Sequence, residues 1–336
     1  MRVWFNHWFS TAYHLINLIK EGNPDKFTII GSSWNELAIY KRACDEWFYE
    51  PKDLDEGQYV EFCLEFCKNN KIDIFVPRRN LVAIVENATR FEEIGVKLFA
   101  DTNAEKIKML SDKLSTYDYF KGMNFECIPE IRVVHSVDEF AKAYKELKDI
   151  YSRVCYKLTV DEGARSFRVI DDKVNNLSAV LERPGTKISF DNALNVLEQY
   201  DFSIPILLMP YLDEVEVSVD CLSTANGNIM VPRYKSGSRY CEVILDKEVM
   251  AICDRMLNTL QIKMPMNIQF KMRKGKLYLL EINSRMSGGL QLSCKATGIN
   301  IPSIAINQLL GNELQWNYPE ITSQKLANIE TPICLY

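Results

Sequence analysis

Hydrophobic and polar residues alternate most regularly near the carboxyl end of the chain. In segment 267–272 every second residue is polar, and segment 277–283 ends with the same alternation, which predicts two β-strands. The connection between them contains Gly275, which can take the positive φ of a tight turn. An odd-length loop centred on Gly275 would pair Gln269 with Glu281, whereas a two-residue turn would send these side chains to opposite faces. A joint function of Gln269 and Glu281 therefore requires a hairpin with an odd-length loop, and a two-residue turn would damage it.

Upstream, the periodicity divides the chain into two kinds of pattern. From residue 1 to about 108, strands and helices alternate, which predicts a small α/β unit with a parallel sheet. From about 109 the pattern becomes α+β, and Ser136 and Glu139 form a capping box that opens one helix. The predicted strands are 2–5, 27–31, 72–77, 154–160, 167–170, 205–212, 214–223 and 228–235, and the predicted helices are 10–21, 59–69, 136–150, 191–200, 246–261 and 301–310.

The turn after the first strand argues against one nucleotide-binding fold. A dinucleotide-binding Rossmann unit carries the pattern G-x-G-x-x-G at this point, whereas residues 6–11 read NHWFST. The ends of the predicted strands nevertheless hold Asn6, Ser10, Arg78 and Arg79, at the edge where α/β folds gather ligands. We therefore expect a ligand-facing edge without a dinucleotide site.

The polar face of the predicted hairpin carries oxygen ligands of the kind that Mg²⁺ binds. Mg²⁺ prefers one or two carboxylates, completed by water and phosphate oxygens. Gln269, Glu281 and Asn283 supply such oxygens with a single negative charge, which is adequate when the metal arrives on ATP. Arg285 would place a bidentate guanidinium beside the same phosphates. An ordinary amphipathic hairpin with a solvated polar face explains the spacing equally well.

Two segments resemble the ATP-grasp superfamily, and within it the large subunit of carbamoyl-phosphate synthetase and its stand-alone ligase relatives. They are EINSRMSGG at 281–289 and KATGINIP at 295–302. Gln269, Glu281, Asn283 and Arg285 fall on the positions of that family's pattern. A looser similarity links the chain to ATP-grasp proteins encoded beside tellurite-resistance genes.

The resemblance implies the domain organisation of this family, in which ATP lies between the antiparallel sheets of a two-lobed domain. The implied parts are a pre-ATP-grasp α/β domain over 1–108 that helps form the acceptor pocket, an ATP-grasp domain over 109–318 with its lid lobe at about 151–212, and a tail over 319–336.

The resemblance also implies where adenosine would bind. In the segment 206–223, Met209 and Leu212 would form the hinge that binds adenine through main-chain groups, and Glu216 would take the ribose hydroxyls. Met209 stands where the family usually has an acid, so that adenine recognition would rest on backbone atoms. From the residues alone, the same segment also reads as a half-exposed pair of strands.

Four basic residues match places where the family binds phosphate. Lys157 lies in an apolar strand, where a lysine either snorkels from an edge or points at a ligand. The loop 161–166 that follows has a single glycine, and its Arg165 would contact phosphate. Lys113 matches an earlier family lysine, although a lone lysine on a helix is more often plain surface. Arg233 would reach the transferred phosphate or the substrate.

Composition agrees with an enzyme of small molecules. The 336 residues include 40 Lys and Arg against 45 Asp and Glu, and the resulting net charge of −5 disfavours a nucleic-acid partner. The longest apolar run, at 204–212, is too short to cross a membrane. No cleavable signal pattern precedes the first strand, which predicts a cytoplasmic location. The cysteines are scattered and are predicted to be buried thiols.

From the resemblance we predict an ATP-dependent carboxylate–amine ligase with ATP and Mg²⁺ as cofactors. A substrate carboxylate would attack the γ-phosphate to give an acylphosphate and ADP, and an amine would then displace phosphate. Arg285, Lys157 and Arg233 would offset the growing negative charge. The partners would be a small carboxylate and an amine, and the relatives imply a homodimer. Two alternatives stay open, namely bicarbonate activation and a non-catalytic ATP-binding sensor or scaffold.

Overall fold

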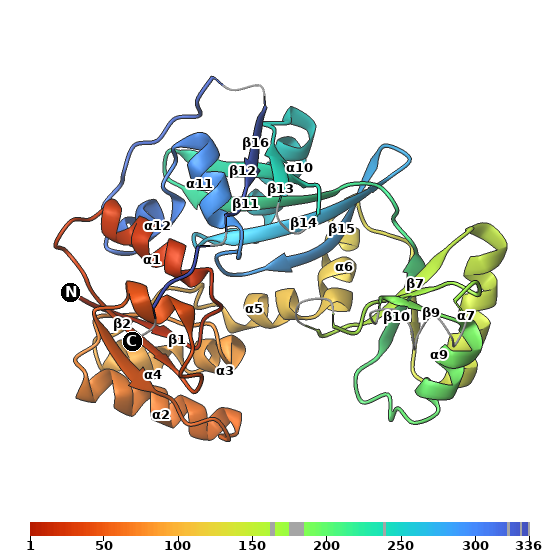
Figure 1. The fold of residues 1–336 in the computed structure, drawn as a ribbon, viewed down its shortest axis with the longest axis horizontal. Helices are drawn as coiled ribbons and strands as arrows, with labels where there is room; N and C mark the ends of the chain where they lie inside the picture. Colours follow the sequence, from red (N-terminus) through yellow and green to blue (C-terminus); the bar gives the residue numbers. More distant parts are fainter. Residues whose placement is uncertain (162–164, 175–184, 238–239, 321–322, 330, 335–336) are drawn as a thin grey trace. The chain divides into compact units, whose positions relative to one another are not determined.

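The computed structural model describes residues 1–161, 165–174, 185–237, 240–320, 323–329 and 331–334. The described residues form three sheets arranged in two compact units (Figure 1). The first unit contains Met1–Ser111, Val215–Gln269 and Glu281–Tyr336, and the second contains Asp112–Glu214 and Phe270–Leu280.

The first sheet is parallel and belongs to the first unit. Its strands are β1 (Arg2–Asn6), β2 (Thr28–Ser33), β3 (Glu46–Tyr49), β4 (Ile74–Val76) and β5 (Lys97–Leu98), in the order β3-β2-β1-β4-β5. The helices of this segment are α1 (Ala12–Glu21), η1 (Ile39–Ala43), α2 (Glu56–Asn69), α3 (Leu81–Glu86), α4 (Ala88–Glu93) and α5 (Ala104–Ser111). Val3 and Phe5 pack into one core and Trp4 packs into another, because helices cover both faces of the sheet.

The third sheet in chain order completes the first unit. Its strands are β11 (Glu216–Thr224), β12 (Gly227–Lys235), β13 (Tyr240–Val243), β14 (Met266–Arg273), β15 (Lys276–Asn283) and β16 (Gln324–Ala327), in the order β15-β14-β11-β12-β13-β16. Its helices are α10 (Lys247–Leu260), α11 (Leu290–Thr297) and α12 (Ile301–Leu309). Helices α1, α11 and α12 lie between this sheet and the parallel sheet, so that one continuous core joins both (Figure 1).

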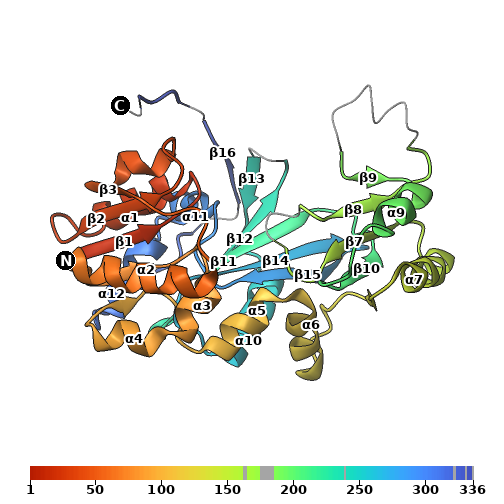
Figure 2. The same cartoon turned by 90° about the horizontal axis from the view of Figure 1, so that it is seen from below.

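The second unit is built around a mostly antiparallel sheet. Its strands are β6 (Arg132–Val134), β7 (Val154–Leu158), β8 (Arg168–Ile170), β9 (Lys187–Ile188) and β10 (Ile206–Pro210), in the order β6-β10-β7-β8-β9. Its helices include α6 (Lys113–Gly122), α7 (Val137–Ile150) and α9 (Phe190–Leu197). Helices α7 and α9 pack together against one face of this sheet (Figure 2). Ser136 caps α7 as predicted, because its hydroxyl accepts from the Glu139 N–H at 3.2 Å.

The predicted fold class is confirmed, since a parallel α/β sheet is followed by antiparallel sheets with helices. The odd-length hairpin loop required for a joint function of Gln269 and Glu281 is not present. Only Lys274 and Gly275 connect β14 to β15, and both have positive φ, at 49° and 71°. Two successive residues in the left-handed region form the turn whose twist matches paired strands, so the two-residue connection is the favoured one.

The sequence did not predict the short strands β3, β5, β6, β9, β13 and β16, of which β3 shows why. Its residues, EWFY, show no alternation, and all four are partly or largely exposed because β3 is an edge strand. Eight of the ten cysteines are buried, in agreement with the expected buried thiols. Within the described part of the chain, no helix has both the length and the apolar character required to cross a bilayer.

Candidate functional site

A buried ion pair lies at the centre of the first unit. Arg233 on β12 and Asp220 on β11 are 4% and 1% exposed, and Arg233 Nε donates to Asp220 Oδ2 at 2.9 Å. The carboxylate of Asp220 also accepts from the hydroxyls of Ser287 and Ser293, each at 2.6 Å, and from Asn267 Nδ2 at 2.9 Å. Because every partner is a donor, the charge of Asp220 is fully compensated.

This ion pair fixes the loop that follows β15. Besides its bond to Asp220, Ser287 accepts from Arg233 Nη2 at 3.2 Å, and its Oγ accepts from the Gly289 N–H at 3.2 Å. Arg233 was predicted to reach a transferred phosphate, and that role stays a prediction. In the structure, Arg233 contacts Ser287 and lies against Gly289, so it positions the loop at 287–289. Sequence reasoning missed Asp220, although a lone acid within the apolar strand VSVDCLS signals a buried partner.

The guanidinium of Arg233 leaves no room for a side chain at position 289. A Cβ at this position would stand 2.3 Å from Arg233 Nη1 and 2.7 Å from its Cζ. Gly289→Ala should therefore displace Arg233 from Asp220 and lower the free energy of unfolding by about 1–3 kcal/mol, as overpacking does. Chemical denaturation measures this loss. Gly57→Ala is the matched control, because its new Cβ would meet only Asp55 Oδ1 at an ordinary 3.5 Å. Equal stabilities of the two variants would contradict the assigned packing.

The predicted metal ligands lie on β14 and β15 near this network. Gln269 Nε2 donates to Asn267 Oδ1 at 2.9 Å, and Asn283 Nδ2 donates to Glu281 Oε1 at 3.2 Å. Each pair therefore shares one face of its own strand, and the amide oxygens of Gln269 and Asn283 are not used in these two bonds. Among the described residues, no three His, Cys, Asp or Glu side chains gather as a metal site. A Mg²⁺ site here therefore depends on one carboxylate and two amides, which suits a metal carried by phosphates.

The two-residue turn affects how Gln269 and Glu281 can meet. With strict alternation, that turn would place them on opposite faces. However, Leu279 and Ile282 on β15 are both buried, at 0% and 3% exposure, although they are three positions apart. The burial pattern of β15 therefore departs from strict alternation, and the metal set of Gln269, Glu281 and Asn283 stays a prediction.

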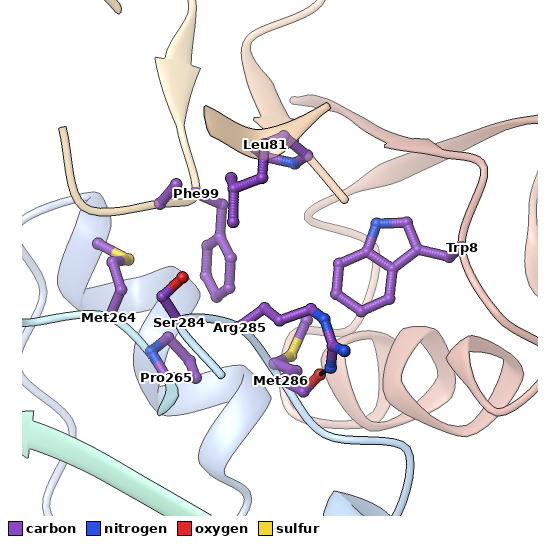
Figure 3. A pocket seen from close by; sticks show the side chains of 10 residues that line it. Trp8, Leu81, Phe99, Met264, Pro265, Ser284, Arg285 and Met286 are labelled. Atoms are coloured by element: carbon purple, nitrogen blue, oxygen red, sulfur yellow. Dashed lines mark hydrogen bonds between the residues drawn. The ribbon is translucent and has the colours of Figure 1, made fainter. Parts of the chain in front are cut away.

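Arg285 extends from the loop after β15 toward the parallel sheet. Its Cζ lies 5.5 Å from the centroid of the Phe9 ring, and its Nη1 donates to the Met286 carbonyl at 3.3 Å. The side chain also lines a small pocket of the first unit (Figure 3). Trp8, Leu81 and other apolar residues form its walls. Arg285 is therefore held at the edge of an apolar wall, and its contact with a phosphate or carboxylate stays a prediction.

The second unit holds both predicted lysines in buried positions. Lys157 on β7 is 8% exposed, and its Nζ donates to the Tyr117 hydroxyl at 3.1 Å and to the Leu280 carbonyl at 3.2 Å. Lys113 is also 8% exposed and donates to the Asp161 carbonyl at 3.0 Å. For Lys113, burial excludes the plain-surface alternative, and phosphate binding stays a prediction for both.

The predicted adenine hinge lies in an apolar cluster of the second unit. Met209 and Leu212 are 2% and 4% exposed and pack with Cys155 and Val169, with Tyr278 and Leu280 against them. The hinge role of Met209 and Leu212 stays a prediction.

The predicted phosphate loop is only partly described. Residues 162–164 lie outside the described residues, and with them Gly163. Arg165 is exposed, and Ser166 donates to Asp161 Oδ2 through both its N–H and its hydroxyl. These two bonds join the ends of the loop. The contact of Arg165 with phosphate stays a prediction.

Glu216, the predicted ribose ligand, opens β11 and forms an ion pair with Lys235 on β12. The two residues are cross-strand partners, and their side chains are 26% and 34% exposed. A partly exposed pair of this kind is easily exchanged for other partners. The ribose role of Glu216 stays a prediction.

The carboxyl edge of the parallel sheet gathers the residues expected there. Asn6 is fully buried, accepts from the Arg78 N–H at 2.6 Å and donates to the Tyr59 hydroxyl at 2.9 Å. Arg79 lies 3.5 Å from the buried Glu50, and its Cζ is 4.1 Å from the Tyr59 ring centroid. Asn6 and Arg79 are thus structural, because their contacts join the loops after β1 and β4 to the core.

His7 at this edge should make folding sensitive to acid. Burial, and then the charges of Arg78 and Arg79, lower the pKa of His7 to about 4, below its ordinary value of 6.5. The unfolded chain therefore binds the proton first, and stability should fall as the pH drops from about 6.5 toward about 4. His7→Asn, which tolerates the positive φ at this position, should flatten that decline.

The His7 prediction is checked by denaturation midpoints across that pH range. His135 is exposed, so His135→Asn is the control and should give the same pH profile as the parent chain. His14, whose pKa is also lowered by burial, should keep part of the acid sensitivity in His7→Asn. Identical profiles for His7→Asn and the parent chain would refute the assignment.

Comparisons with known proteins find a matching family model and similar sequences. The family model described as ATP-grasp in the biosynthetic pathway with Ter operon matches residues 202–332. The large chain of carbamoyl phosphate synthase from Clostridium acetobutylicum is 22% identical over 307 residues, which cover 82% of this chain and 27% of that protein. The chain thus spans about a quarter of the length of this curated relative.

Solved structures share the fold at low sequence identity. The biotin carboxylase domain of 2-oxoglutarate carboxylase from Hydrogenobacter thermophilus, in complex with MgADP, ADP and bicarbonate, superposes with a TM-score of 0.69 at 17% identity. That alignment covers 94% of this chain and 71% of that one. N5-carboxyaminoimidazole synthetase from Staphylococcus aureus, complexed with ADP, gives a TM-score of 0.66 at 13% identity and covers 94% and 78%. At these identities the two structures show a shared fold.

Proposed function

We propose that the chain, which resembles ATP-grasp proteins, is an ATP-dependent ligase that joins a small carboxylate to an amine. The observation that carries the proposal is the grouping of Glu281, Asn283 and Arg285 at the end of β15, next to a loop fixed by the buried Arg233. Solved neighbours hold MgADP or ADP, which supports ATP and Mg²⁺ as the cofactors.

The proposed reaction has two steps. A carboxylate oxygen attacks the γ-phosphorus of ATP, the new C–O–P linkage forms as the bond to the β-phosphate oxygen breaks, and ADP leaves. The amine nitrogen then attacks the acyl carbon, phosphate departs with the electron pair of the C–O bond, and the amine loses a proton to form the amide. Such chemistry needs positioning and charge compensation more than an acid–base residue.

The residues of the chain divide these tasks. Gln269, Glu281 and Asn283 would hold Mg²⁺, which when bound lowers the charge of the phosphates. Arg285 would bind the carboxylate beside the γ-phosphate. In the second unit, Lys157 would bind phosphate oxygens.

Adenosine binding would fall to Met209, Leu212 and Glu216. Met209 and Leu212 would enclose the adenine, and Glu216 would exchange Lys235 for the ribose hydroxyls. Closure of the 161–166 loop would exclude water from the acylphosphate, and this loop falls partly outside the described residues.

Release of ADP from Mg·ATP tests the proposal. We expect release only with a carboxylate present, with product formation after addition of an amine, across a panel of amino acids and small carboxylic acids. Bicarbonate is one member of the panel, because the structure from Hydrogenobacter contains it. Release with bicarbonate alone would instead favour bicarbonate activation. Tight ATP binding without release across the panel would refute the ligase and favour a sensor or scaffold.

A further inference from the structure

A buried asparagine connects the ion pair of the first unit to one of the predicted metal ligands. Asn267 on β14 is fully buried, and its Oδ1 accepts from Gln269 Nε2 at 2.9 Å. Its Nδ2 donates to Asp220 Oδ1 at 2.9 Å and to the Val219 carbonyl at 3.2 Å. Ser218 Oγ lies 3.0 Å from Nδ2 and 3.3 Å from Oδ1 of the same side chain. Both ends of the Asn267 amide are therefore bonded.

The partners of Asn267 allow only one orientation of its amide. A carbonyl and an ionised carboxylate accept hydrogen bonds and cannot donate them, so the amide nitrogen must face Asp220 and Val219. The reverse orientation would set the amide oxygen against these two acceptors and would leave a buried carboxylate short of a donor. The oxygen of Asn267 is thus directed to the other side, where it meets Gln269.

The orientation of Asn267 in turn fixes that of Gln269. Because the amide oxygen of Asn267 can only accept, the end of Gln269 that meets it must be the nitrogen. Among the described residues, no donor is bonded to Gln269 Oε1, and this side chain is only partly buried. Gln269 Oε1 is therefore the end of the amide that is left for a ligand.

We propose that Asn267 is a positioning residue for the metal ion, because it holds the amide of Gln269 with its oxygen outward as a ligand of Mg²⁺. This inference rests on the proposed function, in which Gln269 is one of the ligands of Mg²⁺. Mg²⁺ binds oxygen and not the N–H groups of an amide, so a Gln269 amide free to reverse would present the wrong end. Residues behind a metal ligand commonly set its orientation in this way.

A fixed amide has a larger effect here than in a site rich in carboxylates. A carboxylate presents an oxygen whichever way it turns, whereas only one end of an amide is a ligand. The predicted set contains Glu281 as its one carboxylate, together with the amides of Gln269 and Asn283. Asn283 Nδ2 is also engaged, because it donates to Glu281 Oε1 at 3.2 Å. Both amides of the set are thus held by their nitrogens.

Calorimetric titration of a non-hydrolysable ATP analogue, with saturating Mg²⁺ and again with EDTA, tests the inference. Asn267→Ala should weaken the Mg²⁺-bound analogue by about 10- to 100-fold, as loss of a residue behind a metal ligand does. The same change should weaken the metal-free analogue by less than about twofold, because Gln269 acts only through the metal. If Asn267→Ala does not fold, Asn267→Ser, which is too short to hold Gln269 in the same way, is measured instead.

Two double variants distinguish positioning from a general loss of stability. Asn267→Ala combined with Gln269→Glu should regain most of the affinity for the Mg²⁺-bound analogue, because a carboxylate has an oxygen at each end. In a Gln269→Ala background, Asn267→Ala should weaken the Mg²⁺-bound analogue by less than about a further twofold, since its effect passes through Gln269.

Ser293→Ala is the matched control on the same carboxylate. Ser293 donates to Asp220 at 2.6 Å, but to Oδ2 rather than to the Oδ1 that Asn267 binds. Its loss should lower the thermal midpoint as Asn267→Ala does, and should change the affinity for the Mg²⁺-bound analogue by less than about twofold.

Equal weakening by Asn267→Ala with Mg²⁺ and with EDTA, or no recovery with Gln269→Glu, would overturn the inference. An effect of Ser293→Ala as large as that of Asn267→Ala would overturn it as well. The same holds if neither Mg²⁺ nor Gln269→Ala changes binding of the analogue. ADP release alongside any of these results would leave the ligase function intact. The expected metal dependence without ADP release across the acid panel would support the role of Asn267 and refute the ligase function.

Discussion

Glu281→Gln is expected to reduce Mg·ATP-dependent turnover by about 100-fold or more, which is the loss typical when a group that stabilises charge at a reacting centre is removed. Glu281 is the only carboxylate among the three predicted metal ligands, and the amide of Gln keeps its size without its charge. The measurement is the rate of ADP release at saturating ATP, with whichever carboxylate supports turnover in the parent chain. Higher Mg²⁺ should restore part of the rate, because the weakened site then fills by mass action.

The controls separate metal binding from folding. Glu281 is only partly buried, so the thermal midpoint of Glu281→Gln should stay within a few degrees of the parent. The exposed Glu313→Gln makes the same chemical change away from the hairpin and should keep full turnover. Undiminished turnover in Glu281→Gln would remove the metal assignment and, with it, the role given to Gln269 and Asn283.

Asp220→Ala is expected to lower the free energy of unfolding by about 3–5 kcal/mol, because it leaves the guanidinium of Arg233 buried without its charge partner. Ser287, Ser293 and Asn267 would lose the same acceptor. Chemical denaturation of purified protein measures this effect, and no substrate has to be known. The loop at 287–289 should also loosen, since its hydroxyl contact to Asp220 disappears.

The neighbouring ion pair gives a matched comparison on the same two strands. Glu216→Ala removes the partner of Lys235, but both side chains reach solvent, so the expected cost is at most about 1 kcal/mol. The contrast between the two variants isolates burial as the cause, because each removes one acid on β11 that forms an ion pair with one base on β12. Equal costs would show that the Asp220 network is not the buried anchor assigned to it.

Local patterns in the sequence were sufficient for much of this fold. Alternation and capping predicted most strands and helices of the chain, because a half-buried element must repeat its apolar residues with its own period. The same reasoning brought Glu281 and Asn283 onto one face of β15, two residues apart, as their hydrogen bond confirms. The same reasoning did not predict the edge strand β3, because an exposed edge does not require an apolar face.

The hairpin shows where sequence reasoning stopped. Its existence followed from alternation, but the two-residue connection and the burial of both Leu279 and Ile282 did not. A turn type depends on how two strands twist together, and an irregularity within a strand depends on what packs against it. Neither the turn type nor the strand irregularity can be predicted from one segment alone.

The sequence by itself predicted the fold class, the resemblance to ATP-grasp proteins and the shared face of Glu281 and Asn283 on β15, because these depend on short-range periodicity and on a contiguous motif. Only the tertiary structure decided that Arg233 is buried against Asp220 and that Arg78 and Arg285 each lie over the ring of Phe9. Asp220 and Arg233 are 13 positions apart on different strands. Phe9 is 69 positions from Arg78 and 276 positions from Arg285, distances that no local pattern spans. Burial and charge pairing are properties of neighbours in space, and the fold alone assigns those neighbours.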